Sequence, residues 1–86
     1  MDPFIFQEEK QMETIGLMWL EEQFREDYFI VFRVRCLSYP NSIALIKVSK
    51  NRYKIFKGEY ELRLGEILMV HRLAKARMDD YDLYSS

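Results

Sequence analysis

The sequence predicts a small α+β domain with an N-terminal helix, a three- to four-stranded antiparallel sheet and a C-terminal helix. Three observations support this fold class. Good helix formers fill residues 7–25, segments rich in β-branched and aromatic residues follow between short turns, and alanine, lysine and arginine return after residue 66. Apolar residues make up 49% of the 86 residues, which is enough for a packed core, and no repeat or linker divides the chain. Residues 1–86 are therefore expected to form one domain.

The first helix is expected over residues 7–25, where Glu, Gln, Met and Leu predominate and only Gly16 opposes helix formation. At about 100° per residue, its apolar side chains, Trp19 and Phe24 among them, spread over an arc of roughly 200°, with Met18 outside the arc. A helix that packs on one sheet needs an apolar stripe of only about 100°. This excess apolar surface favours contact with another chain.

Strands are expected over residues 28–37, 43–48 and 52–57. Apolar and basic residues alternate in the first of them, as a strand with one solvent-facing side requires. Pro40 marks a turn, and Asn51, which tolerates a left-handed backbone, suits a short hairpin loop. Residues 60–64 also alternate, so they predict a fourth strand or the end of a bent third one.

A C-terminal helix is expected over residues 66–78, although residues 67–70 also fit a buried strand. With that strand, the alternative fold is the N-terminal helix plus a small five-stranded β-barrel. Residues 79–86 combine three aspartates with two tyrosines and are expected to form a flexible acidic tail.

Charge is distributed unevenly along the chain, although the net charge is −1. Residues 1–32 carry two basic and eight acidic side chains, whereas residues 33–77 carry eleven basic and three acidic ones. Such asymmetry is typical of a surface that binds polyanions, or of two complementary surfaces that meet within the molecule or across a dimer.

Side chains suited to catalysis are few. Cys36 and His71 are the only thiol and imidazole, and Cys36 falls on the inward side of its strand, where a cysteine usually acts as a small apolar residue. Two such residues do not complete a zinc site, and three isolated glycines provide no phosphate-binding loop. We therefore expect a protein that is not an enzyme, with no cofactor, no metal and no small-molecule substrate.

The expected location is the cytoplasm. The longest apolar run, residues 15–20, is far shorter than the ~20 residues that span a bilayer. The N-terminal residues lack the basic region of a secretory signal, and a single cysteine forms no internal disulfide. No contact with a membrane is expected.

The leading functional hypothesis is a protein–protein interaction module that acts as a small regulator or inhibitor of a larger protein, or as a homodimeric adaptor. It rests on the wide apolar arc, the opposed charges and the scarcity of catalytic side chains. The residues expected at the interface are Met18, Trp19, Phe24, Arg33 and Arg35.

The alternative hypothesis is nucleic-acid binding by a basic and aromatic hairpin at residues 50–57. Strand alternation places Arg52, Lys54 and Phe56 on one side, so that cations reach phosphates and a ring stacks on a base. Arg33, Arg35 and Lys47 extend this patch if the solvent-facing sides of the strands coincide. The same residues also fit a simpler role, in which charged side chains on an edge strand prevent aggregation. The candidate nucleic-acid contacts are Lys50, Arg52, Lys54, Phe56 and Lys57.

Overall fold

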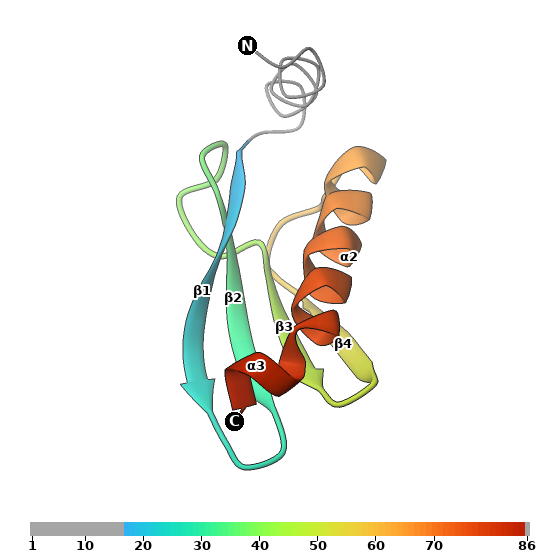
Figure 1. Cartoon of the computed structure of the whole chain (residues 1–86). Coiled ribbons are helices and arrows are strands. Elements are labelled where there is room, and N and C mark those ends of the chain that lie inside the picture. Colours follow the sequence, from blue (N-terminus) through green and yellow to red (C-terminus); the bar gives the residue numbers. More distant parts are fainter. Residues whose placement is uncertain (1–16, 86) are drawn as a thin grey trace, which may run out of the picture.

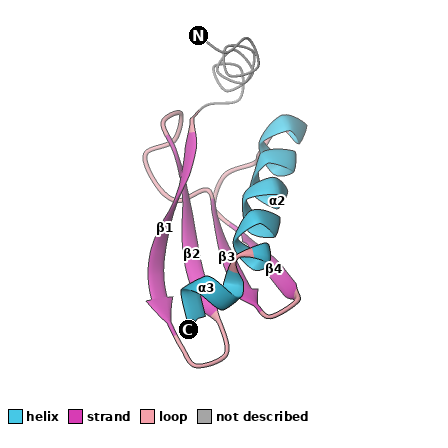
Figure 2. Ribbon diagram, in the orientation of Figure 1, coloured by secondary structure: helices cyan, strands magenta, loops and turns pink. Residues whose placement is uncertain are grey.

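The structure is a computed structural model that describes residues 17–85 as four strands and two helices. The strands lie side by side in the order β1-β2-β3-β4, and each pairs antiparallel with its neighbour (Figure 1). Figure 2 shows both helices on the same side of this sheet. The elements are β1 (Met18–Arg25), β2 (Ile30–Cys36), β3 (Ala44–Ser49), β4 (Arg52–Lys57), α2 (Leu64–Asp79) and α3 (Tyr81–Ser85).

The expected N-terminal helix is wrong over the described part of its range, because Met18–Arg25 forms strand β1. Leucine, glutamate and glutamine favour a helix locally, but pairing with β2 over the whole strand outweighs that preference. In a strand, Met18 and Leu20 face the core, while Trp19 and Glu21 point the opposite way. Residues 7–16 of the expected helix lie outside the described residues.

The antiparallel sheet and the C-terminal helix are confirmed, whereas the barrel alternative is wrong because β1 and β4 are separate edges of an open sheet. The two-residue loop between β3 and β4 has Asn51 at a φ of 65°, the left-handed conformation expected for it. Residues 60–64 form no strand. Tyr60 instead packs on Tyr39, with ring centroids 4.8 Å apart, and Leu64 begins α2.

A capping box fixes the start of α2. The Glu66 carboxylate accepts a hydrogen bond from the Arg63 backbone N–H at 2.7 Å and another from the Tyr39 hydroxyl at 3.1 Å. Glu66 is buried, so these two donors compensate for the loss of water around its charge. The cap thereby ties α2 to the loop between β2 and β3.

The core lies between the sheet and the two helices. Apolar residues alternate on β2 and β3, and their inward side chains meet Val70 and Ala74 of α2. Residues 79–86, expected as a flexible tail, include α3, and its Tyr81 side chain is buried in this core. The core residues are Met18, Ile30, Phe32, Val34, Cys36, Ile43, Ala44, Ile46, Val48, Val70, Ala74 and Tyr81.

Candidate functional site

The sheet has one face that no described element covers, because both helices lie on the other side (Figure 1). We call it the open face. Cross-strand pairing assigns side chains to it, since residues paired across neighbouring strands point to the same side. Its principal residues are Trp19, Glu21, Phe24, Phe29, Val31, Arg33, Arg35, Leu45, Lys47, Ser49, Arg52, Lys54 and Phe56.

Basic side chains from three neighbouring strands gather on the open face. Arg33 and Arg35 come from β2, Lys47 from β3, and Arg52 and Lys54 from β4. Lys47 and Lys54 are direct cross-strand partners, a pairing of like charges that weakens a sheet. A repulsive pair of this kind suits a surface that meets negative charge.

Aromatic rings lie among these cations. Trp19, Phe24 and Phe56 are exposed by 37%, 47% and 42%, which leaves part of each ring in contact with solvent. The Lys47 ammonium lies 4.3 Å from the centroid of the Phe29 ring, and the Lys54 ammonium lies 5.2 Å from that of Phe56. Such cation–π contacts hold the two lysine side chains against the sheet.

Two acidic groups lie close to the basic side chains: Glu21 on the β1 side of the open face, and Glu59, which lines a hollow together with Arg33 and Arg35. Glu21 accepts a hydrogen bond from the Trp19 indole N–H at 3.2 Å and lies 3.8 Å from the Arg35 guanidinium. Glu22 lies on the other side of β1, opposite Phe32; it pairs with Arg25 at 2.7 Å, and this hydrogen bond lowers the pKa of its carboxyl. The basic side chains of β3 and β4 therefore face solvent without an acidic neighbour on their own strands.

Two shallow hollows mark the basic parts of this surface. One, of about 370 Å³, has Arg33, Arg35 and Asn41 in its lining, together with the acidic side chain of Glu59. The other, of about 260 Å³, is lined in part by Lys47, Arg52 and Lys54 and by no acidic residue. The second hollow therefore offers several cationic donors to one anionic group, as phosphate recognition requires.

Residues predicted for two different functions come together on this surface. Trp19, Phe24, Arg33 and Arg35, expected to contact a protein, share the open face with Arg52, Lys54 and Phe56, expected to contact nucleic acid.

Three predicted site residues lie elsewhere. Met18 is buried in the core, Lys50 lies in the β3–β4 turn, and Lys57 points to the helix side of the sheet. Phe29, which completes the aromatic set, was not predicted. Phe29 lies two residues before Val31, so strand alternation places both side chains on the same side of the sheet. This spacing is the sequence signal that could have identified Phe29.

Cys36 and His71 are the thiol and the imidazole that the sequence offers. Cys36 is buried, and His71 shares a 3.1 Å hydrogen bond with the Tyr53 hydroxyl. Within residues 17–85, no group of three or more histidine, cysteine, aspartate or glutamate side chains has the geometry to hold a metal ion. Neither described helix combines the length and the apolar composition that crossing a membrane requires.

Comparison with known proteins finds no match to a family model, to a curated protein or to a solved structure.

Proposed function

We propose that the protein binds single-stranded nucleic acid on the open face of its sheet. The observation that carries this proposal is the convergence of five basic side chains from β2, β3 and β4 with exposed aromatic rings on one uncovered surface. Phosphates attract the cations, and unpaired bases of any nucleic-acid sequence stack on the aromatic rings. A strand crossing the sheet would meet both kinds of group.

The open sheet favours a single strand over a duplex. Single strands present unstacked bases to a flat surface, where aromatic side chains replace the lost stacking. No described helix projects from the open face to enter a major groove. The hollow lined by Lys47, Arg52 and Lys54 would hold a backbone phosphate, and Phe56, two residues after Lys54 on the same face, would stack on a base.

The protein-interaction hypothesis stays a prediction, but its main argument concerned a helix that residues 17–25 do not form. Trp19 and Phe24 remain exposed on β1, with Arg35 opposite Trp19 and Glu21 hydrogen-bonded to it. The basic side chains of β2, β3 and β4 on the same face favour a polyanion as the partner of this face.

Fluorescence anisotropy with a labelled single-stranded oligonucleotide of mixed sequence tests the proposal. Replacing both Lys47 and Lys54 by alanine removes two phosphate contacts, so we expect about tenfold or greater weakening at low salt. The slope of log K against log salt should also become shallower by about 1.4, since each contact contributes about 0.7 for single strands.

The matched control replaces Arg72 and Lys75, two exposed basic residues of α2, by alanine. It makes the same change of charge on the helix side of the molecule and should leave the affinity within about twofold. Equal losses of affinity in both double variants would show that the binding depends on net charge alone and not on the open face. Absence of binding by the native chain at low salt would exclude the proposed function.

A further inference from the structure

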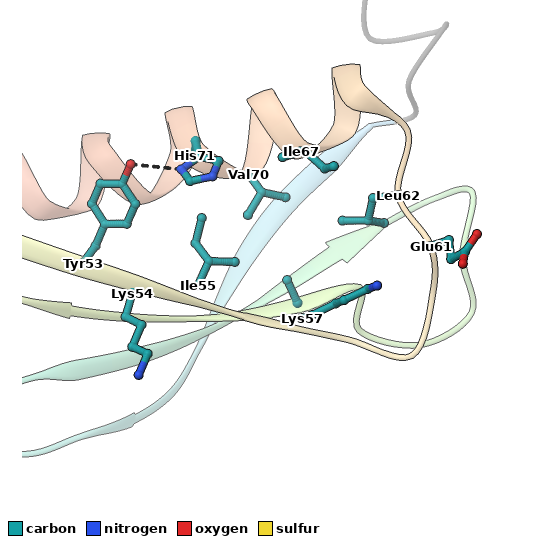
Figure 3. A pocket seen from close by; sticks show the side chains of 10 residues that line it. Tyr53, Lys54, Ile55, Lys57, Glu61, Leu62, Ile67, Val70 and His71 are labelled. Carbon is teal, nitrogen blue, oxygen red and sulfur yellow. Dashed lines mark hydrogen bonds between the residues drawn. The ribbon is translucent and has the colours of Figure 1, made fainter.

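A second recess lies on the other side of the sheet, between the edge strand β4 and helix α2 (Figure 3). It has a volume of about 680 Å³, within the ~300 to 1,000 Å³ range of ligand sites. Ile55, Leu62, Ile67 and Val70 project into it from β4, the following loop and α2, and face one another in its centre.

The recess is polar at its two ends. At one end, the hydrogen bond between the Tyr53 hydroxyl and His71 Nδ1 links β4 to α2. At the other end lie Lys57 and Glu61, while Lys54 points away to the open face. The apolar stretch between these ends follows the length of β4.

Within the described residues, backbone groups of β4 are unpaired at the sheet edge beside this recess. The Gly58 N–H donates to the Ile43 carbonyl at 3.0 Å, so the backbone of Gly58 faces β3. The register between β3 and β4 has no shift, and strand backbone groups alternate in direction. Tyr53, Ile55 and Lys57 therefore direct their N–H and C=O groups outward, at the edge where no described strand pairs with β4.

We propose that this recess binds an extended peptide segment of a partner protein, which pairs with β4 as a fifth strand. Every second side chain of the peptide would enter the recess. Because the centre of the recess is apolar, we expect those side chains to be aliphatic. Its other side chains would lie beside Arg52 and Lys54 on the open face, where acidic residues pair favourably across strands. The partner sequence is thus an alternation of aliphatic and acidic residues. The recess itself is separate from the proposed nucleic-acid surface, and the peptide would share only Arg52 and Lys54 with that surface.

Hydrogen exchange of the full chain tests whether the edge is available. Amides of Lys54 and Phe56, which face β3, should exchange slowly, while those of Tyr53, Ile55 and Lys57 exchange quickly. If all five are protected without added peptide, residues 1–16 or a second copy already occupy the edge, and the proposal is overturned.

A labelled heptapeptide of alternating glutamate and valine is the probe for binding. Saturating peptide should slow exchange at Tyr53, Ile55 and Lys57 and shift the methyl resonances of Ile55 and Val70. A peptide with lysine in place of glutamate should bind at least tenfold more weakly. No binding of either peptide at about 1 mM, or equal binding of both, would overturn the proposal.

Two neighbouring residues of α2 provide a matched pair of variants. Ile67 lines the recess, whereas Leu68 does not, and both are exposed enough to accept glutamine without loss of the core. Ile67→Gln should weaken the glutamate–valine peptide about tenfold and leave oligonucleotide affinity unchanged, whereas Leu68→Gln should alter neither. Equal effects of the two variants on the peptide would contradict the assigned site.

Discussion

Of the glycines in residues 17–85, Gly58 is the one that tolerates a side chain least well. A Cβ there would lie 2.4 Å from the Ile43 carbonyl oxygen, which also accepts the Gly58 N–H bond. Because the obstacle is backbone, Gly58→Ala should lower the free energy of unfolding by about 1 to 3 kcal/mol, measured by urea denaturation. Gly65→Ala, in the first turn of α2, is the control and should be neutral or slightly stabilising. Equal stability of the Gly58 variant and the native chain would refute the close contact.

The contact between Tyr39 and Glu66 makes stability depend on pH in the alkaline range. Desolvation, followed by the hydrogen bond to the Glu66 carboxylate, raises the pKa of Tyr39 above its ordinary value of 10.0. The unfolded chain therefore loses this proton first, so the contribution is complete below about pH 10 and is lost as pH rises through the folded-state pKa. Denaturant titrations from pH 8 to about pH 11 should show a steeper decline for the native chain than for Tyr39→Phe. Parallel declines in the two proteins would show that the ionisation of Tyr39 does not contribute to the loss of stability at high pH.

The turn between β3 and β4 determines the shape of the hairpin that carries three of the five basic side chains of the open face. Asn51 has a φ of 65°, a conformation that costs most residues about 1 to 2 kcal/mol. Asn51→Gly should leave the urea midpoint unchanged or raise it, whereas Asn51→Ala should lower the free energy of unfolding by about 1 kcal/mol. Lys50→Ala, at the preceding turn position, should stay within about 0.5 kcal/mol of the native value. An alanine at position 51 without cost would contradict the left-handed turn.

Strands β2, β3 and β4 were predictable because each carries its own local signal. Apolar and basic residues alternate within them, and Asn51 marks the turn. Strand β1 was not predictable, since its glutamates, glutamine and leucine favour a helix and most of its side chains are exposed. Only its pairing with β2, a contact distant in sequence, makes it a strand.

The candidate site was predictable in its parts but not as a surface. Alternation correctly separated Arg52, Lys54 and Phe56 from Tyr53, Ile55 and Lys57. Whether Arg33 and Lys47 lie on the same side of the sheet as Lys54 depends on the register between strands, which a single sequence does not specify. The recess beside β4 depended on where α2 packs, so no sequence pattern indicated it.

The uneven charge along the chain becomes a spatial separation across the folded protein. The acidic residues described in the first third lie on edge strand β1 and in the turn that follows it, while basic residues of β2, β3 and β4 cover the open face. Glu21 and Arg35 meet where these regions adjoin. An anionic strand would therefore be attracted to the β2–β4 side of the sheet and repelled from the β1 edge.

The most direct test of the nucleic-acid proposal is an NMR titration of the full chain with a single-stranded oligonucleotide at low salt. We expect the resonances of Lys47, Lys54 and Phe56, on β3 and β4, to shift progressively. The methyl resonances of Val70 and Ala74, buried side chains of α2, should stay in place. An unchanged spectrum, or shifts confined to α2, would contradict the assignment of the open face as the binding surface.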